Sequence, residues 1–253
     1  MNIEIIPCLN DNYSYLLHDE ISNKVAIVDP SEFTVCDEII NKSYKKLDFI
    51  LNTHHHYDHV GGNEELKKKY NSTVLGFEKD KNRIPAIDEV LKDNQEFKIG
   101  LLNFTTIFIP GHTKGHIAFY FKKEKVLFTG DTLFSLGCGR VFEGTYKQMF
   151  QSLNKLKDLP GDTKIYCGHE YTYKNLDFCL TYNPNNSFLK KKKSDIEQSL
   201  KNKKPTIPST IDDEIKANIF LRFNDPDVKK AINLENSSDI EIFTKLRDLK
   251  DIF

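Results

Sequence analysis

The residues between Thr53 and Asn63 are the part of the sequence best suited to chemistry. Within six consecutive positions they supply five side chains that can bind a metal ion, namely His54, His55, His56, Asp58 and His59. In an extended segment successive side chains alternate, so that His54 and His56 share one face and His55 lies on the other. Imidazole and carboxylate suit zinc, iron or manganese. A polar surface loop with a chance histidine run is the alternative interpretation.

Three further candidate ligands each follow a β-prone run and stand beside a glycine. They are found in Gly111-His112, Gly130-Asp131 and Gly168-His169. With four residues of the first cluster, all but His55, they make seven ligands, more than the four protein groups of a closed structural zinc site. We therefore predict two metal ions that share one carboxylate. The predicted ligands are His54, His56 and His112 for one ion, Asp58, His59 and His169 for the other, and Asp131 for both.

Four other residues near these motifs are given supporting or ordinary roles. Asp29 is predicted to hold an imidazole in its metal-binding orientation. His116 lies four residues beyond His112 and is interpreted as a supporting or structural residue, with a ligand role as the alternative. His18 and His55 are interpreted as ordinary residues.

The elements that must position the candidate ligands are short strands that end in turns. Strands are expected at residues 3–6, 13–17, 25–28, 47–51, 73–76, 101–109, 117–121, 126–128 and 164–167. Helices are expected at 32–44 with Ser31 as N-cap, at 62–70, and from Thr145, which has capping-box spacing with Gln148. Residues 77–95 are expected to be mostly loop. Layered α/β folds place their sites where strand ends gather along one edge.

Beyond about residue 172 helical periodicity replaces the β-branched runs. Helices are expected at 176–182, 188–203, 211–223 and 239–253, with an extended connector at 205–208. We predict two domains, a catalytic domain at 1–174 and a helical domain at 175–253. The run from Lys190 to Lys193 is interpreted as a solvated helix face.

The composition limits the possible functions. The chain has 253 residues, and its 29% of charged residues and mean hydropathy of -0.50 fit a soluble globular protein. Its net charge of -1 argues against a nucleic-acid-binding surface spread over the molecule. Five widely spaced cysteines without a CxxC pair argue against a disulfide framework and favour a reducing compartment. No apolar run approaches the roughly 20 residues that cross a bilayer, and the N-terminus matches neither a signal nor a transit peptide. We expect a cytoplasmic monomer that binds neither nucleic acid nor membrane.

The metal-binding motifs resemble the metallo-β-lactamase superfamily. Within that superfamily four segments resemble glyoxalase II, the hydroxyacylglutathione hydrolases. These segments are Thr53 to Asn63, Cys138-Gly139-Arg140 with Glu143-Gly144-Thr145, Cys167 to Tyr171, and Pro208-Ser209-Thr210. The likeness runs nearly end to end and implies a four-layer αββα sandwich with metals at one edge, followed by a C-terminal helical domain.

The resemblance implies hydrolysis of the thioester S-D-lactoylglutathione to D-lactate and glutathione, a step in methylglyoxal detoxification. Two divalent ions, zinc first and iron or manganese as alternatives, would lower the pKa of a bridging water from 15.7 towards roughly 7. Asp58 and Asp131 would be the catalytic residues that act with the resulting hydroxide. The sulfur can leave as a thiolate, because a thiol has a pKa of about 8.5. No strong general acid is therefore required.

By position in the family pattern, four residues would bind the glutathione part of the substrate, namely Arg140, Tyr171, Arg247 and Lys250. From spacing alone, the last two would be an i, i+3 pair on an exposed helix face. The chain departs from the family at Phe142, often a tyrosine, which removes one hydroxyl contact. It also departs at Ile219, usually a proline, which bears on local helix geometry rather than on chemistry.

Three other functions rank lower. A single-iron glutathione persulfide dioxygenase of the same superfamily would ordinarily lack the helical extension. A nuclease or phosphodiesterase that acts on RNA would be basic, with aromatic residues interleaved. A non-catalytic metal-binding module would have little need for an open site with a full ligand set.

Overall fold

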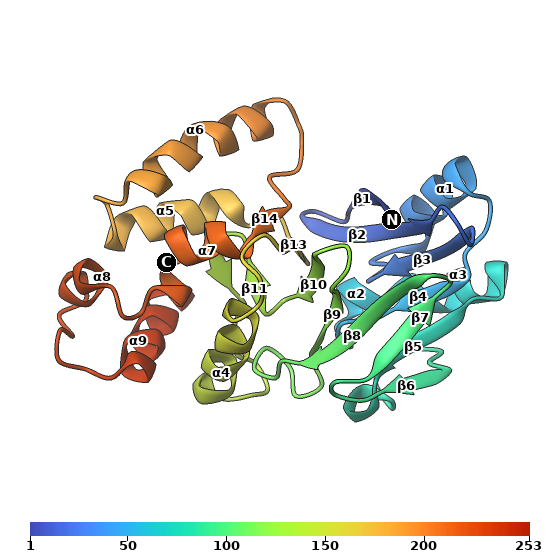
Figure 1. Cartoon of the computed structure of the whole chain (residues 1–253), viewed down its shortest axis with the longest axis horizontal. Coiled ribbons are helices and arrows are strands. Elements are labelled where there is room, and N and C mark those ends of the chain that lie inside the picture. The colour runs from blue at the N-terminus through green and yellow to red at the C-terminus, as the bar shows by residue number, and fades with distance from the viewer. The chain divides into compact units, whose positions relative to one another are not determined.

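The computed structural model describes residues 1–253 (Figure 1). Its Cα positions divide into two compact units. Unit 1 comprises Met1–Phe108 and Thr113–Gly130, and unit 2 comprises Ile109–His112 and Asp131–Phe253. Each unit is described by itself below. The predicted domain boundary after residue 174 stays a prediction.

The first sheet of unit 1 has six strands in sequence order, β1 (Asn2–Cys8), β2 (Asn12–Asp19), β3 (Lys24–Val28), β4 (Phe49–Leu51), β5 (Thr73–Phe77) and β6 (Glu89–Leu91). Strands β1 to β3 are antiparallel, and β3 to β6 are parallel. Parallel neighbours need a crossover connection, which α1 (Phe33–Ser43) supplies before β4 and α3 (Asn63–Tyr70) supplies before β5. Both helices pack their apolar residues on one face of this sheet.

A second series of strands covers the other face of the sheet. It consists of β7 (Glu96–Ile99), β8 (Leu102–Phe108), β9 (Ile117–Phe121) and β10 (Val126–Gly130), all antiparallel to their neighbours. Three aromatic pairs join the two layers, with ring centroids 5.2, 6.0 and 4.8 Å apart in Tyr15–Phe128, Phe49–Phe97 and Phe77–Phe108. Unit 1 is therefore built of a helix layer, a sheet and a second layer of strands. Every strand predicted for residues 1–130 is confirmed within a few residues.

Unit 2 begins with the hairpin β11 (Leu133–Phe134) to β12 (Gly137–Cys138), followed by α4 (Tyr146–Lys157) and β13 (Lys164–Cys167). At the start of α4 the backbone N–H of Gln148 donates to Thr145 Oγ1 at 3.1 Å, and that of Thr145 donates to Gln148 Oε1 at 2.9 Å. The predicted capping box is confirmed.

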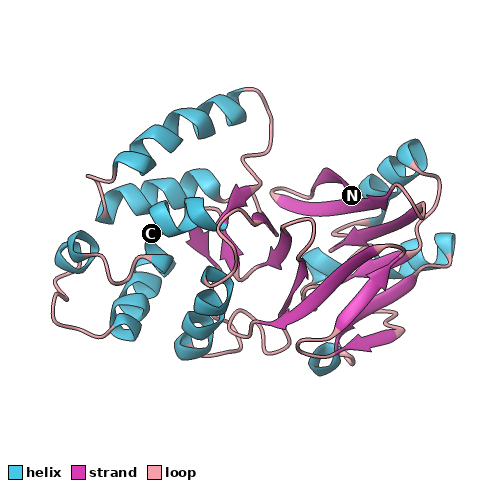
Figure 2. Ribbon diagram, viewed as in Figure 1, coloured by secondary structure: helices cyan, strands magenta, loops and turns pink.

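The remainder of unit 2 is mostly helical (Figure 2). It contains α5 (Thr172–Tyr182), α6 (Ser187–Lys201), α7 (Ile211–Ala217), α8 (Pro226–Ala231) and α9 (Asp239–Asp251). The short strand β14 (Ser209–Thr210) pairs with β13. Phe220 packs between Phe178 and Phe243, with centroids 5.8 and 6.1 Å away, and forms the aromatic centre of this helical region. No helix is both long enough and apolar enough to span a membrane.

The structure corrects the predicted start of α1 and adds two short elements to residues 77–95, which are mostly loop as predicted. The N-cap of α1 is Glu32 rather than Ser31. Ser31 is buried, and its backbone N–H donates to Ser14 Oγ at 3.1 Å. The stretch expected to be loop contains a 3-10 helix at Glu78–Asp80 and the strand β6. A three-residue strand is too short to produce a periodic signal.

The single helix predicted at 211–223 is also wrong. Helix α7 ends at Ala217, and a 3-10 helix at Ile219–Leu221 follows. Asn218 has extended backbone angles, and its Oδ1 accepts the N–H of Phe220 at 3.0 Å, so it ends one helix and caps the next. Helix α8 was not predicted. Its sequence signal is Asp225 as N-cap with Pro226 at the first helical position.

Candidate metal centre

The segment from Thr53 to Asn63, called the histidine turn below, follows β4 and contains the short helix α2 (Tyr57–Val60) in unit 1. Asn52 Nδ2 donates to the carbonyl oxygen of His59 at 3.1 Å. Asn12 Nδ2 donates to the carbonyl oxygen of Asp58 at 3.1 Å and to its carboxylate at 3.0 Å. Amide side chains on both sides therefore fix the backbone of the turn.

Two glycines leave space for this turn. At Gly61 a Cβ atom would lie 2.4 Å from the carbonyl oxygen of Ser31. Gly130 has a φ of +46°, and a Cβ there would lie 2.4 Å from Thr53 Oγ1 and 2.8 Å from the His116 ring. A larger residue at either position would displace the turn or the neighbouring imidazole.

Asp29 orients the turn from the end of β3. Its carboxylate accepts the backbone N–H of Thr53 at 2.8 Å and the Thr53 hydroxyl at 2.7 Å. Its Oδ2 also lies 3.0 Å from Nδ1 of His59. Both His59 and Asp29 are buried. The predicted contact of Asp29 with an imidazole is present, and its role in metal binding stays a prediction.

Three imidazole rings of unit 1 surround His54. The centroid of the His54 ring lies 4.7 Å from that of His56, 4.2 Å from that of His59 and 4.6 Å from that of His116, which is stacked on it. His54 and His116 are fully buried. The stacking supports a packing role for His116.

His55 has a different partner. Its Nδ1 lies 3.1 Å from a carboxylate oxygen of Asp80, a fully buried residue that also forms an ion pair with Arg83. His55 therefore anchors the turn to the segment after β5, which agrees with its exclusion from the predicted ligands.

In unit 2 the candidate ligands His112 and His169 both lie close to the carboxylate of the third, Asp131. Asp131 Oδ2 lies 3.4 Å from Nε2 of His112 and 3.2 Å from Nε2 of His169. The His169 ring stacks on Tyr171, with centroids 4.7 Å apart and planes at 5°. All three candidate ligands are buried. The residue predicted to bridge two ions is thus the one that both histidines approach.

Proton positions in these contacts favour a cation. His112 Nδ1 lies 2.8 Å from the carbonyl oxygen of Arg140. Since a carbonyl can only accept, Nδ1 carries a proton, which leaves Nε2, beside Asp131, as the ring nitrogen that could hold a metal ion. In unit 1 the carboxylate of Asp29 similarly accepts a hydrogen bond from His59 Nδ1, and His59 Nε2 lies 3.7 Å from Asp58 Oδ2. Imidazole nitrogens and carboxylate oxygens therefore converge at both places, and these are the atoms that bind metal ions.

Two of the candidate substrate residues, Arg140 and Arg247, meet at Asp251. Its Oδ1 lies 3.6 Å from Nε of Arg140 and 3.0 Å from Nη2 of Arg247. Arg247 Nη1 donates to the carbonyl oxygen of Cys138 at 2.8 Å, and its guanidinium lies 5.1 Å from the Phe220 ring centroid. Arg247 is only 3% exposed, so the exposed helix face expected from spacing is wrong for this residue.

Lys250 is less buried than Arg247 and has a perturbed pKa. Its ammonium group donates to the carbonyl oxygen of Lys174 at 3.1 Å and lies 5.0 Å from the ring centroids of Phe178 and Phe253. Burial, with the positive charge of Arg247 nearby, lowers the pKa of Lys250 to about 8. Its charge therefore changes within a pH range that an enzyme assay can reach.

Comparison with known proteins identifies the family. Residues 10–169 match the profile of the metallo-beta-lactamase superfamily, and residues 170–253 match the profile described as the hydroxyacylglutathione hydrolase C-terminus. A protein of Pelagibacter ubique called hydroxyacylglutathione hydrolase is 51% identical over 253 residues, which cover 100% of both chains. The chain belongs to the hydroxyacylglutathione hydrolase family. A Brucella ovis protein of the same name is 45% identical over 100% of this chain and 98% of its own.

A solved structure agrees with the fold of this hydroxyacylglutathione hydrolase family. The crystal structure of ETHE1 from Myxococcus xanthus matches with a TM-score of 0.70 and 22% identity, over 98% of this chain and 91% of that chain. At this identity the likeness concerns the fold alone. The predicted metallo-β-lactamase fold with a C-terminal helical domain is confirmed.

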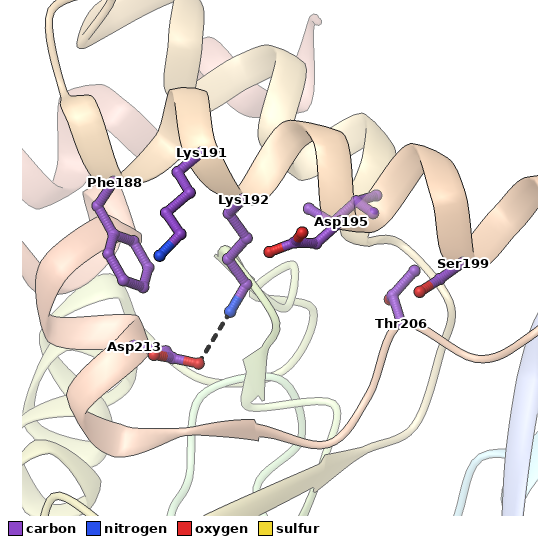
Figure 3. Close-up of a pocket in the computed structure, with 8 residues that line it drawn as sticks. Phe188, Lys191, Lys192, Asp195, Ser199, Thr206 and Asp213 are labelled. Atoms are coloured by element: carbon purple, nitrogen blue, oxygen red, sulfur yellow. Dashed lines mark hydrogen bonds and ion pairs between the residues drawn. The ribbon is translucent and has the colours of Figure 1, made fainter.

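One pocket of unit 2 is lined by none of the predicted site residues. It lies between α6, α7 and the 205–208 connector, has a volume of about 240 Å³ and is lined in part by Phe188, Lys192 and Asp213 (Figure 3). The Lys192 side chain is 14% exposed, and its ammonium lies 3.1 Å from Asp213. The expected solvated face is therefore wrong for Lys192.

Residues that support the candidate ligands were missed by sequence reasoning. Thr53 bonds both Asp29 and Nδ1 of His54, the latter at 3.0 Å. Glu170 follows His169, and its carboxylate accepts the backbone N–H of Thr206 at 2.9 Å and its hydroxyl at 2.8 Å. Both lie directly beside a predicted ligand, and that adjacency was the available signal.

Proposed function

We propose that this chain hydrolyses S-D-lactoylglutathione to D-lactate and glutathione, the thioester-cleaving step of methylglyoxal detoxification. The observation that carries the proposal is the match, over the full length of both chains, to a 51% identical protein called hydroxyacylglutathione hydrolase. The His and Asp clusters of both units supply the groups that a metallohydrolase needs.

We further propose that the ligands of the two units together bind two divalent metal ions. His54, His56 and His112 would hold one ion, Asp58, His59 and His169 the other, and Asp131 would contact both. The imidazole nitrogens and carboxylate oxygens that converge support this assignment, as does the chemistry of the donors. Zinc suits such a set best, with iron or manganese as alternatives. When bound, the ions would supply Lewis acidity and lower the pKa of water.

The carboxylates of Asp58 and Asp131 would act as catalytic residues. Asp58 is held by the amide of Asn12, so its carboxylate is oriented before a substrate arrives. Each carboxylate can accept a proton from an attacking water molecule. It can also keep the lone pair of the water oxygen directed at the thioester carbonyl carbon. The leaving sulfur needs no general acid, since a thiolate is stable near neutral pH.

The glutathione moiety is proposed to contact Arg140, Tyr171, Arg247 and Lys250. Arg140 has the most exposed of the three cationic side chains, at 60%, and is therefore the best placed to meet a carboxylate from solvent. Arg247, which is buried beside Cys138 and Asp251, would act mainly by holding the segment that carries Arg140. Phe142 is 62% exposed, and its ring centroid lies 5.2 Å from that of His112, so it would offer an apolar contact in place of a hydroxyl.

The test combines a thioester assay with variants of two histidines. The protein with its native metal is given S-D-lactoylglutathione, and the released thiol is measured. His169→Ala is expected to lose one of two metal ions and to slow turnover by about 100-fold or more, because a ligand is removed. The control is His18→Ala, since Nε2 of His18 bonds only the side chain of Asn23, at 2.9 Å.

Unchanged metal content and full activity in His169→Ala would refute the ligand assignment. If the wild-type protein failed to release thiol but consumed oxygen with glutathione persulfide, the dioxygenase function would replace the hydrolase. The five cysteines are free, which supports our proposal that the protein works in a reducing compartment such as the cytoplasm. A monomeric state remains a prediction.

A further inference from the structure

We propose that Cys8 and Cys36 form a redox modification site, in which hydrogen peroxide converts the two thiols into an intramolecular disulfide. Their Sγ atoms lie 3.9 Å apart. Cys8 is the last residue of β1, and Cys36 lies in the first turn of α1. Both side chains are buried, at 3% and 0% exposure, so they face each other inside unit 1.

The local structure keeps the two thiols together. The backbone N–H of Leu9 donates to Oε1 of Glu32 at 2.8 Å, which ties the end of β1 to the N-terminus of α1. Cys36 and Cys8 also belong to the same apolar cluster between the helix and the sheet. A disulfide has an S–S length of about 2.05 Å, so the sulfurs must approach further, by side-chain rotation within a contact that already exists.

The two thiols are chemically unequal. The pKa of Cys8 is lowered, chiefly because the thiol of Cys36 hydrogen-bonds to its sulfur. The pKa of Cys36 is raised well above its ordinary value by the same contact and by burial. Because the thiolate is the nucleophile, Cys8 is the residue that attacks an oxidant and Cys36 the residue that resolves the product.

The chemistry is balanced with hydrogen peroxide as the oxidant. The Cys8 sulfur attacks one peroxide oxygen, the O–O bond breaks, and sulfenic acid and water form. The Cys36 sulfur then attacks the sulfenic sulfur, the S–O bond breaks, and a second water molecule leaves with the thiol proton. In sum, two thiols and one peroxide give one disulfide and two water molecules. Peroxide is close to water in size, and Leu9, the neighbour of Cys8, is 50% exposed.

The other three cysteines lack these features. Burial raises the pKa of Cys167 and of Cys179 to about 12, and their thiols donate to the carbonyl oxygens of His169 and Leu136. Burial also raises the pKa of Cys138, whose sulfur lies 3.6 Å from Arg247. They stay protonated at neutral pH, and each provides an internal comparison for the pair.

The disulfide would join β1 to α1 across 28 positions of the chain. Closing a segment of this length restricts the unfolded chain, so oxidation should raise the melting temperature. Ser14 also connects the pair to Asp29, which contacts the histidine turn. Ser14 Oγ is 3.5 Å from Cys8 Sγ and donates to the carbonyl oxygen of Asp29 at 2.6 Å.

The experiment treats the full-length, metal-loaded protein with one to two equivalents of hydrogen peroxide. Remaining thiols are alkylated in denaturant, and the digest is analysed by mass spectrometry. Thiols should fall from five to three per chain, with a peptide that links Cys8 to Cys36, a loss of two hydrogen masses and full recovery with dithiothreitol. The melting temperature of the oxidised protein should be higher by a few degrees.

Variants separate the pair from general oxidation. Cys179→Ser should still lose two thiols, whereas Cys8→Ser and Cys36→Ser should form no internal disulfide. In Cys36→Ser, oxidation should stop at the sulfenic acid of Cys8, which dimedone traps. Five thiols in the treated wild-type protein, a linked peptide with other cysteines, or disulfide-linked dimers on a non-reducing gel would each overturn the proposal.

Discussion

A single carboxylate, that of Asp29, organises the histidine turn at the scale of residues. Asp29 has a φ of +50°, an uncommon conformation for a residue with a Cβ, and its backbone N–H donates to the carbonyl oxygen of Leu51 at 2.9 Å. This geometry points its carboxylate at Thr53 and His59. Because a carboxylate on Nδ1 fixes the tautomer that leaves Nε2 for a metal, we expect Asp29 to influence metal affinity through His59.

Asp29→Asn is expected to weaken metal binding by about 10- to 100-fold, because the amide cannot accept all three hydrogen bonds. The affinity is measured by competition with a chelator of known strength. Asp19→Asn is the matched control, since Asp19 is also buried in unit 1 and accepts from Ser22 and from the N–H of Leu101, away from the histidine turn. Equal metal affinities for the two variants would contradict the orienting role.

Lys250 gives a pH-dependent prediction. Its pKa of about 8 means that it loses its positive charge as pH rises through that value. If it binds a carboxylate of glutathione, KM should rise by about 3- to 10-fold between pH 7 and pH 9, the scale of one partly exposed ion pair. Lys250→Arg keeps its charge and should show a flatter KM profile. Identical profiles for the two proteins would remove Lys250 from the binding site.

Residue types and spacing were enough to predict the contact of Asp29 with an imidazole and the gathering of His112 and His169 around Asp131, while the ligand assignment stays a prediction. They were not enough for Arg247, whose burial follows from the packing of α9 against Phe220 and from the carbonyl of Cys138, more than one hundred positions earlier in the chain. Helical spacing specifies which residues share a face. It does not specify what covers that face, so the burial of Arg247 could be learned only from the structure.

At the scale of elements, Glu214 joins α7 to the hairpin that precedes Arg140. It is fully buried, and its Oε2 accepts the N–H of Leu136 at 2.7 Å and Nδ2 of Asn218 at 3.0 Å. Burial raises its pKa above the ordinary value of 4.5. The native state therefore holds this proton more tightly than the unfolded chain does.

Two variants test this link. Glu214→Ala should lower the free energy of unfolding by about 2 to 5 kcal/mol, because two buried donors lose their acceptor. Glu214→Gln keeps one oxygen for both donors and should fold. Since the native pKa is raised, the wild-type protein should lose stability relative to Glu214→Gln as pH rises above 4.5. Urea melts at several pH values give the comparison, and a constant difference would contradict it.

The elements most accessible to prediction were those with strong local signals. The long strands of unit 1 and the capping box of α4 were predicted because alternation and Thr145 with Gln148 act within a few residues. The break at Asn218 was not, because it depends on hydrogen bonds from the Asn218 amide to the carbonyl of Gly137 and to Glu214. Tertiary contacts override helical periodicity at such positions.

At the scale of the whole molecule, the candidate ligands are divided between two compact units. Unit 1 supplies His54, His56, Asp58 and His59, and unit 2 supplies the three later ligands. The order of these motifs along the chain allowed the family to be predicted, and the match over residues 10–169 and 170–253 confirms it. The identity of the ions could not be predicted, because imidazole and carboxylate accept zinc, iron and manganese alike.

We propose that thioester hydrolysis by this chain depends on two metal ions. The most direct measurement is the metal content per chain, determined on the same sample in which hydrolysis of S-D-lactoylglutathione is followed during stepwise chelation. We predict about two ions per chain, a rate that falls as they are removed and a rate that returns when they are restored. Full hydrolysis by the metal-free protein, or two bound ions without hydrolysis, would contradict the claim.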